Sequence, residues 1–384
     1  MQGHLDRILT THVGSLPRTV EVLDAMKAKL TCGEYNEESY EAAISAGVKD
    51  IVSKQAELGI DVVTDGEMSK SGFFTYIEER MAGFEPRRDE PFKMFEAEIN
   101  AFPEYYAEYF ARAMMGGQVV KMFPMYCVGP VSYKGQEALK RDIDNLKGAL
   151  QDVDVEGAFV PATAPAGVGY NEYYNTEEEF AEAVAEALRE EYEAIVEAGF
   201  LLQIDDPFLC DIFVDPNLDE KGMDTKANTY IEAINHSIRN IPEEKIRFHT
   251  CYGINEGPRI YEAPGDLIAK YMLKIKAGSY SFEAANARHE HEYHVWEDLK
   301  LPEGRALIPG VITHASNIVE HPELIAERLI RYAERVGREN VLAGGDCGFS
   351  SQACYHTEVH PTVIWAKFEA MAEGARIATQ KLWK

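Results

Sequence analysis

Two residues that commonly bind metals lie two positions apart in the middle of the chain. His249 and Cys251 follow Ile246 and Phe248 in a stretch that is typical of a buried β-strand. Because side chains at positions i and i+2 of a strand point to the same side, both could bind one ion. A single Cys on an apolar strand is more often a small core residue. The pair therefore needs further ligands to make a metal site.

Two other short apolar runs end in suitable ligands. Glu283 ends the run 278–283, and Cys347 ends the run 341–347. Zinc takes four ligands from Cys, His and carboxylates, or three plus an open position. A set of one nitrogen, two sulfurs and one oxygen suits zinc well. The sequence therefore predicts a zinc cofactor bound by His249, Cys251, Glu283 and Cys347.

This ligand set favours a particular reaction. Two thiolates and a carboxylate leave the bound zinc with about one unit of negative charge, which makes it a poor activator of water. Such a zinc can still bind an incoming thiol and hold it as a nucleophilic thiolate. A hydrolase would more often keep its metal electrophilic with His-rich or carboxylate-rich ligation. We therefore expect alkyl transfer to sulfur rather than hydrolysis.

The remaining strand ends supply polar residues that could bind a substrate. Glu67 and Asp205 could hold the ammonium group of an amino-acid thiol, or they could simply pair with Lys or Arg. His314 could give a proton to the leaving group, or it could be a structural histidine. The full set of candidates at these strand ends is Gly14, Ser15, Glu67, Asp205, Asp206 and His314.

A rival metal site lies just after Glu283. His289, His291 and His294 alternate with Glu residues over a short stretch. On a helix, side chains at i and i+2 point apart, and this alternation is typical of a solvated loop or helix face. We therefore rank this second histidine group below the first site.

The elements that must position these residues alternate regularly. Apolar runs that end in Gly, Pro or acidic residues alternate with segments of helical spacing, such as residues 322–336. Eight such repeats predict a (β/α)8 TIM barrel, in which active sites lie at the carboxyl ends of the strands. The predicted strands cover residues 8–15, 60–67, 157–162, 199–207, 246–251, 278–283, 306–314 and 341–347.

Residues 71–125 do not follow this alternation. They are rich in aromatic residues and Met, with Tyr105, Tyr106, Tyr109 and Phe110 close together. We expect an inserted helical segment after the second strand, lying over the barrel mouth or forming a subunit contact. A Tyr and Phe stripe of this kind is more often packing than a ligand site.

Length and composition restrict the class of protein. The 384 residues fit one catalytic barrel with an insertion. The net charge of −27 disfavours a nucleic-acid partner. Six widely spaced cysteines indicate reduced thiols and a cytoplasmic location, and no apolar run is long enough to cross a membrane. We expect a small-molecule thiol and an alkyl donor as partners, with a homo-oligomer possible.

Several motifs together resemble a known family. They lie in residues 10–18, 65–67, 203–207, 249–251, 282–283, 345–347 and the run that ends in His314. In this order they resemble the C-terminal catalytic barrel of cobalamin-independent methionine synthase. The resemblance implies zinc bound by the four ligands named above and methyl transfer to a thiol. It also implies that Ser15, Glu67 and Asp205 bind the amino-acid part of homocysteine, and that His314 is the proton donor.

Other functions remain open within and outside this family. Residues 311–322 are more similar to single-barrel relatives, which include enzymes that add coenzyme M thiolate to epoxyalkanes. Thiolate addition to an epoxide, or methyl transfer to or from another thiol, is therefore an alternative, although Glu67 and Asp205 would repel a sulfonate. A protein of another class, a zinc-stabilised binding subunit of a larger methyltransferase assembly, could dock through residues 71–125.

Overall fold

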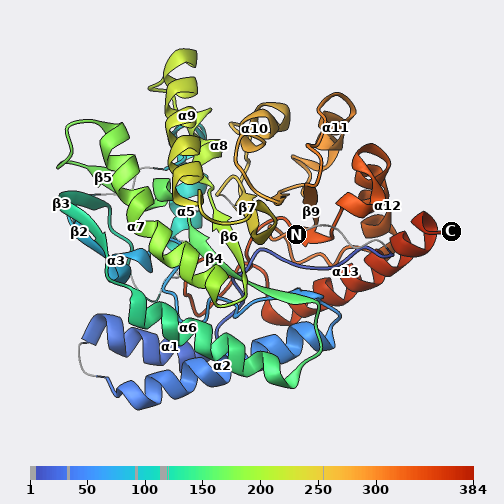
Figure 1. Cartoon of the computed structure of the whole chain (residues 1–384), viewed down its shortest axis with the longest axis horizontal. Helices are drawn as coiled ribbons and strands as arrows, with labels where there is room; N and C mark the ends of the chain where they lie inside the picture. The colour runs from blue at the N-terminus through green and yellow to red at the C-terminus, as the bar shows by residue number, and fades with distance from the viewer. Residues whose placement is uncertain (1–5, 33–34, 91–93, 113–118, 120, 254) are drawn as a thin grey trace.

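A curled parallel β-sheet with helices on its outer side forms the centre of the protein (Figure 1). The computed structural model describes residues 6–32, 35–90, 94–112, 119, 121–253 and 255–384. Seven strands follow one another in the sheet in the order in which they occur in the chain, and all neighbouring pairs are parallel. They are β1 (Val62–Val63), β4 (Gly157–Thr163), β6 (Leu201–Asp205), β7 (Ile246–Thr250), β8 (Ser279–Phe282), β9 (Ala306–Ile312) and β10 (Gly344–Gly345).

The strands are buried because both of their faces are covered. Every residue of β7 and of β9 is buried, as expected for a parallel sheet with helices on one side and a packed interior on the other. A buried Arg247 in β7 donates to Thr11 Oγ1 and to the carbonyl of His12, at 2.9 Å each. The interior therefore also contains a cation whose hydrogen bonds are made across the sheet.

The first predicted strand, residues 8–15, is reduced in the structure to an isolated β-bridge. Thr10 makes an isolated parallel bridge with Ala343, and the amide of Thr11 donates to the Ala343 carbonyl at 2.8 Å. On its other side, the Thr10 carbonyl accepts from the amides of Asp61 and Val62, at 3.1 Å each. This segment thus lies between the first and last strands of the sheet and is bonded to both.

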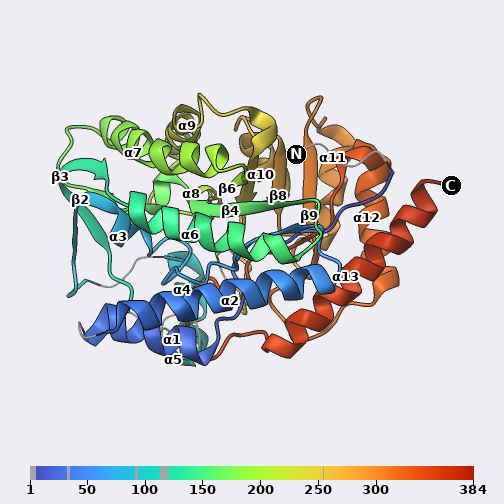
Figure 2. The same cartoon turned by 60° about the horizontal axis from the view of Figure 1, so that its bottom comes forward.

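Helices follow most strands and pack against one another on the outside (Figure 2). Pairs in contact include α2 with α6, α7 with α9, and α12 with α13. Among the described residues, every helix is too short or too polar to span a membrane. The helices are α1 (Val20–Lys27), α2 (Glu37–Glu57), α6 (Gln136–Ala149), α7 (Glu177–Glu197), α8 (Phe208–Ile212), α9 (Glu220–Ser237), α10 (Gly265–Met272), α11 (Val295–Asp298), α12 (Pro322–Val336) and α13 (Pro361–Leu382).

Residues 71–125 are not helical throughout, contrary to our expectation. They include helices α3 (Ile77–Arg80), α4 (Glu96–Ala101) and α5 (Pro103–Arg112), but also strand β2 (Met81–Pro86). Strand β2 pairs antiparallel with β3 (Met125–Tyr133), and β5 (Tyr170–Asn171) completes a second, three-stranded sheet. Positions 91–93, 113–118 and 120, which include part of the Met-rich stretch, lie outside the described residues.

A glycine explains why β2 can pair closely with its partner. Gly83 has φ +94°, and a Cβ at this position would lie 2.6 Å from the carbonyl oxygen of Pro130. Only a residue without a side chain allows the two backbones to approach so closely.

The aromatic side chains of α5 pack inside the protein. Tyr106 and Tyr109 of α5 are almost fully buried and contact each other. Packing is therefore the role of these two aromatic side chains.

Candidate metal and substrate site

Three of the predicted metal ligands meet at the carboxyl end of the sheet. His249 is in β7, Cys251 directly follows it, and Cys347 follows β10. One ligand atom from each lies within 4.8 Å of the others. Strands β7 and β10 are separated by two other strands, so the curl of the sheet brings these residues together. We call His249, Cys251 and Cys347 the thiol cluster.

The imidazole of His249 is arranged as a metal ligand would be. Its Nδ1 contacts Ser281 Oγ at 3.2 Å, whereas its buried Nε2 has no hydrogen-bond partner among the described residues. Burial, with a contribution from the nearby cation Arg247, lowers the pKa of His249 to about 3. The ring is therefore neutral at physiological pH. A buried nitrogen with a free lone pair is costly unless something binds it.

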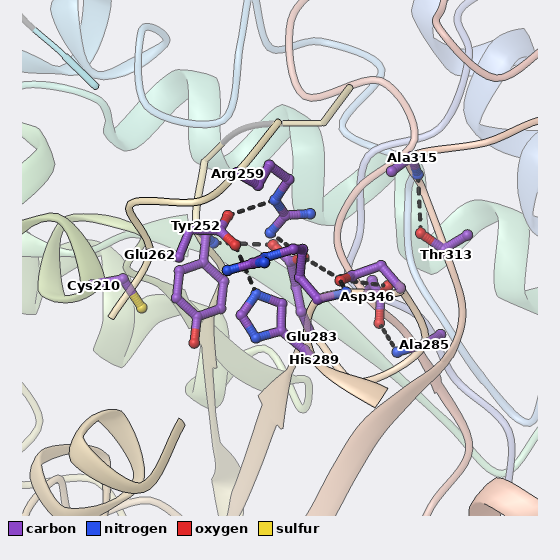
Figure 3. Close-up of polar contacts among 12 residues, drawn as sticks. Cys210, Tyr252, Arg259, Glu262, Glu283, Ala285, His289, Thr313, Ala315 and Asp346 are labelled. Atoms are coloured by element: carbon purple, nitrogen blue, oxygen red, sulfur yellow. Dashed lines mark hydrogen bonds and ion pairs between the residues drawn. The ribbon is translucent and has the colours of Figure 1, made fainter. Parts of the chain in front are cut away.

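The fourth predicted ligand, Glu283, is held elsewhere. Its Oε2 accepts from Arg259 Nη2 at 2.7 Å and from Asn286 Nδ2 at 2.8 Å, and its Oε1 accepts from the amide of Tyr252 at 3.0 Å (Figure 3). Its carboxylate lies within 4.8 Å of ligand atoms of His314 and Asp346. The structure therefore brings three of the four predicted ligands together and places Glu283 in an adjacent group, which we call the carboxylate cluster.

Among the described residues, the three histidines of the rival site do not form a metal site. Both nitrogens of His289 are already bonded, Nε2 to Glu262 at 3.0 Å and Nδ1 to Glu292 at 2.8 Å. Burial opposes its charge, but these two carboxylates raise the pKa of His289 to about 9, so it carries a proton. His291 and His294 are exposed, and the three side chains do not form a possible metal group.

His289 belongs instead to a buried chain of charges that reaches Glu283. Arg259 Nε donates to Glu262 at 2.5 Å, and Glu262 in turn bonds His289. The ring of Tyr252 stacks on His289 with centroids 4.1 Å apart (Figure 3). Arg259 has φ +55°, a conformation that costs energy for a residue with a side chain. No sequence pattern predicts this arrangement, because Arg259 lies in a loop without a recognisable motif.

Two of the predicted substrate-binding acids, Glu67 and Asp205, lie close together, and the cation Lys70 influences both of them. Burial raises the pKa of Asp205 well above its usual value, and the nearby Glu67 raises it further. Glu67 has φ +58°, and its buried Oε2 has no hydrogen-bond partner among the described residues. Burial also raises the pKa of Glu67, although Lys70 and Arg18 act in the opposite direction. This pair is suited to a cationic group of a ligand.

Gly14 and Ser15 connect this acid pair with the loop after Cys347. Gly14 has φ +144°, and a Cβ there would lie 2.7 Å from Pro161 Cγ. Its amide donates to His12 Nδ1 at 3.2 Å, so it is already used. The Ser15 carbonyl accepts from the amide of Phe349 at 3.0 Å. Of the two residues, Ser15 is thus the better candidate for contact with a substrate.

Arg18 is a residue of the site to which the sequence assigned no role. It is buried and donates from Nη2 to the carbonyls of Glu67 and Lys70, at 2.8 Å each. Its Nη1 donates to the carbonyl of Ser350 at 3.0 Å. Arg18 thereby joins the loop that carries Glu67 to the loop after Cys347. Its position at the end of the motif 10–18 was the only available signal.

Asp206 and His314 are both buried, and neither belongs to the thiol cluster. Asp206 Oδ1 accepts from the amide of Leu209 at 3.0 Å, at the start of α8, and burial raises its pKa to about 7. His314 belongs to the carboxylate cluster, and burial lowers its pKa to about 4. Its buried Nδ1 lacks a hydrogen-bond partner among the described residues.

A cavity of about 1120 Å³ opens over the thiol cluster. His249, Cys251 and Cys347 line it, together with Ser15, Glu67 and Asp205. The aromatic-rich segment 71–125 supplies part of its wall, including Phe73, Phe74, Phe95 and Phe123. Among the predicted residues, Gly14, Asp206, Glu283 and His314 are not in its lining. The cavity has room for two small reactants beside the thiol cluster.

Comparison with known proteins identifies the family. A family model described as "Cobalamin-independent synthase, Catalytic domain" matches residues 8–132 and 152–365. The chain belongs to this family. This match covers every residue of the thiol cluster and of the carboxylate cluster.

Individual relatives are distant but similar over nearly the whole chain. A methionine synthase of Thermococcus kodakarensis is 24% identical over 377 residues, which are 97% of this chain and 94% of the relative. A 5-methyltetrahydropteroyltriglutamate–homocysteine methyltransferase of Aliivibrio fischeri (strain MJ11) is 26% identical over 379 residues, which are 98% of this chain and 42% of the longer relative.

A solved structure supports the same fold. The B12-independent methionine synthase from Shewanella sp. W3-18-1, in complex with selenomethionine, superposes with a TM-score of 0.72 at 18% identity. The superposition covers 98% of this chain and 99% of that one. The curled parallel sheet with outer helices is therefore shared over the full length.

Proposed function

We propose that this protein is a zinc-dependent S-methyltransferase that transfers a methyl group to the thiol of homocysteine. The observation that carries the proposal is the thiol cluster, in which two cysteines and the free Nε2 of His249 line one cavity. Relatives that cover most of the chain are named methionine synthase, which supports this acceptor. Family membership supports methyl transfer as the reaction class.

The donor atoms of the thiol cluster fit zinc. His249 Nε2 and the sulfurs of Cys251 and Cys347 would hold the ion, leaving a fourth position for Glu283 or for the substrate thiol. Bound zinc would lower the pKa of that thiol and keep it as a thiolate at neutral pH. For Glu283 to be the fourth ligand, it must exchange its ion pair with Arg259 for the metal.

The acid pair and Ser15 would position the amino-acid part of the acceptor. Glu67 and Asp205 line the cavity and would bind the ammonium group of homocysteine. A cation at this point would also relieve the repulsion that raises the pKa of Asp205. Ser15, in the same lining, would contact the carboxylate. Asp206 would act indirectly, because its hydrogen bond fixes the start of α8.

His314 would act as the proton donor from behind the cavity wall. As a neutral imidazole it must first take up a proton, and Asp346 beside it is the group that favours the charged form. This arrangement would let the donor group leave as a neutral molecule.

The hydrogen bonds between residues 8–15 and the first and last strands of the sheet support a closed barrel. We infer that the segment bonded to both sheet edges closes a (β/α)8 barrel, with residues 1–384 forming one catalytic domain. Residues 71–125 would then be an insertion after the second strand that helps to wall the cavity. Helix α13 would cover the closing segment, since Thr379 Oγ1 accepts from the amide of Ile8 at 3.1 Å.

The proposal is tested by following the metal when thiols are added. The purified protein would be loaded with zinc and examined by zinc-edge X-ray absorption, alone and with homocysteine, cysteine or coenzyme M. We expect homocysteine to add one sulfur ligand to the two from the protein. Failure to bind zinc would overturn the proposal. A response to coenzyme M alone would favour thiolate addition to an epoxide, which the acid pair disfavours.

A further inference from the structure

Three loops at the carboxyl end of the sheet carry the groups that would hold the two ends of the acceptor. Ser15 ends the first predicted strand, Glu67 follows β1, and Cys347 follows β10. In the proposed function, Cys347 is a ligand at the thiol end of the acceptor, whereas Glu67 binds its ammonium group. The separation of these loops therefore decides which thiols can be held at both ends at once. We call the three segments the anchoring loops; they are residues 13–18, 65–73 and 347–353.

The backbone of Glu67 is fixed in a strained conformation. Its φ is +58°, and the preceding Gly66 has φ +67°. The Glu67 amide donates to Asp65 Oδ1 at 2.9 Å. Its carbonyl accepts from Arg18 Nη2 at 2.8 Å and from the amide of Lys70 at 3.1 Å. A left-handed residue with a side chain persists only where the surrounding structure holds it, so Arg18 helps to fix the point at which the Glu67 side chain enters the cavity.

Arg18 holds a second anchoring loop with the same guanidinium group. Its Nη1 donates to the carbonyl and to the hydroxyl of Ser350, at 3.0 and 3.2 Å, while Nη2 donates to the carbonyls of Glu67 and Lys70. In the part of the chain that the structure describes, Arg18 forms no ion pair, so its donors serve these contacts. A guanidinium group is planar, and its donors have a fixed relative geometry. Arg18 therefore fixes the position of Ser350 relative to Glu67.

Ser15 connects the first anchoring loop with the loop of Cys347. The Ser15 carbonyl accepts from the amide of Phe349 at 3.0 Å, and its hydroxyl accepts from the amide of Ser350 at 3.4 Å. A Cβ at Gly348 would lie 2.0 Å from Ser15 Oγ, so the backbone next to Cys347 lies directly against this side chain. A few hydrogen bonds thus join the predicted metal ligand to both residues that would hold the amino-acid part of the acceptor.

Backbone hydrogen bonds hold the outer parts of two anchoring loops together. The amide of Phe73 donates to the Ser351 carbonyl at 2.9 Å, and the amide of Ala353 donates to the Ser71 carbonyl at 2.8 Å. These bonds lie farther along each loop than the contacts of Arg18, and they do not involve its side chain. Replacement of Arg18 should therefore loosen the inner parts of the loops without unfolding them.

We propose that Arg18 is a positioning residue through which the enzyme selects its acceptor by the length of the chain between the thiol and the amino group. By fixing Glu67 relative to the loop of Cys347, it sets a separation that homocysteine spans and that cysteine, which is one methylene group shorter, does not. A difference of one methylene group is worth about 10- to 200-fold in discrimination between substrates. This inference rests on the proposed function and adds the residue that restricts its acceptor.

The first test measures the binding of three thiols to the zinc-loaded protein by calorimetry. Homocysteine and cysteine differ by one methylene group, and ethanethiol lacks the amino-acid part. We expect the wild type to bind homocysteine at least about tenfold more tightly than cysteine. Equal affinities for the two amino acids would overturn the inference and leave the proposed function standing. A protein that did not bind zinc, or did not bind homocysteine, would overturn the proposed function as well.

Two substitutions of Arg18 separate its hydrogen bonds from its charge. Arg18→Met removes both, whereas Arg18→Lys keeps the charge but lacks the planar fork of donors. In both variants we expect the preference for homocysteine over cysteine to fall to about threefold or less, with ethanethiol bound as tightly as by the wild type. Full preference in either variant would overturn the inference, and in the Lys variant it would show that only the charge near Glu67 matters. Arg18→Lys alone decides the question if Arg18→Met does not fold.

Arg328→Met is the matched control. Arg328 is also buried and donates to two backbone carbonyls, those of Val311 and Ala285, at 3.0 Å each. Among the described residues its other partner is Glu290, so none of its hydrogen bonds reaches an anchoring loop. This variant should lose stability without a change in the ratio of the two affinities. An equal fall of that ratio in Arg328→Met, or weaker binding of ethanethiol in the Arg18 variants, would mean that general loosening of the site is responsible, and the inference would be wrong.

Discussion

The thiol cluster and the carboxylate cluster are neighbouring groups of possible metal ligands, and they differ in how far the rest of the protein bonds their ligand atoms. In the thiol cluster, His249 Nε2 is buried without a hydrogen-bond partner among the described residues. In the carboxylate cluster, Asp346 Oδ1 accepts from the amides of Ala284 and Ala285, at 2.7 Å each, and Arg259 holds Glu283 (Figure 3). The two groups influence each other: the pKa of Cys347 is raised first by Cys251 and by burial, and the charge of Glu283 raises it further.

This difference shows how a binding site can be distinguished from a structural group of the same residue types. The carboxylates of Glu283 and Asp346 are satisfied by the protein itself and connect the ends of β8 and β10. Even β9 is adapted to this contact, because a Cβ at Gly310 would lie 2.0 Å from Asp346 Oδ1. Each cluster has one buried histidine nitrogen without a partner among the described residues, but only His249, in the thiol cluster, lines the cavity from which an external partner could reach it, whereas His314 does not. We therefore expect the metal at the thiol cluster and stability from the carboxylate cluster.

The strongest test of this contrast removes one thiol ligand. Cys251→Ser should lower zinc affinity and methyl transfer by about 1,000-fold or more, because a serine hydroxyl is a poor zinc ligand at neutral pH. Zinc content by mass spectrometry and turnover of homocysteine would measure these effects. Cys210→Ser is the matched control, since Cys210 is also buried but contacts Thr250 Oγ1 at 3.3 Å and not the cluster. Loss of zinc in both variants would mean that general packing is responsible.

The second test breaks the ion pair of the carboxylate cluster. Arg259→Met should lower the free energy of unfolding of the metal-free protein by about 3 kcal/mol or more, because Glu283 and Glu262 would remain buried without their cation. Urea unfolding of the metal-free protein would measure this loss. Cys251→Ser should change the same quantity far less. Equal losses in the two variants would remove the distinction between the clusters.

The strands and the paired ligands could be predicted from the sequence because they depend on local pattern. Parallel strands buried on both faces give continuous apolar runs, as in β9, whereas β7 was recognised from Ile246 and Phe248 alone. The spacing of His249 and Cys251 fixed their common direction once a strand was recognised. Neither feature depends on contacts with residues that are distant in the sequence.

The remaining features depend on contacts that no local pattern records. The pairing of β2 with β3 joins segments about 45 residues apart, and it requires a glycine whose partner is a distant carbonyl. The position of Glu283 depends on Arg259, which reaches it from a loop. The charge of His289 depends on two glutamates, one of them 27 residues away. The histidine-rich stretch therefore resembles a ligand group in sequence, although His289 is a buried cation and His291 and His294 are exposed.

A smaller effect is expected at the acid pair, where binding and stability should change in opposite directions. Asp205 has a pKa raised above its value in the unfolded chain, so the folded state holds its proton more tightly. Stability is therefore lost as the pH rises from the unfolded pKa of about 3.9 through the higher folded pKa. Asp205→Asn removes this loss and should stabilise the ligand-free protein by about 1 kcal/mol at neutral pH.

The same substitution should weaken binding of the acceptor. Loss of one carboxylate from the ammonium site should raise the KM for homocysteine by about tenfold or more. Unfolding measured across the pH range, together with KM, would test both effects. Glu172→Gln serves as an exposed control, because among the described residues its carboxylate is bonded at the surface to Arg87. A variant that lost both stability and affinity would show that Asp205 is needed for folding instead.

The smallest effect is expected at the second histidine group, where His291 and His289 should differ although they are two positions apart. His291 is exposed, and His291→Ala should leave zinc content unchanged and alter the free energy of unfolding by less than about 0.5 kcal/mol. His289→Ala should also leave zinc content unchanged, but it should destabilise the protein because Glu262 and Glu292 lose their common cation. The loss should be greatest below the unfolded pKa of about 6.5, should shrink as the pH rises from there to the folded pKa of about 9, and should be almost absent above it. If either substitution removed zinc, the metal would lie at the histidines, and the contrast between the two clusters would have to be abandoned.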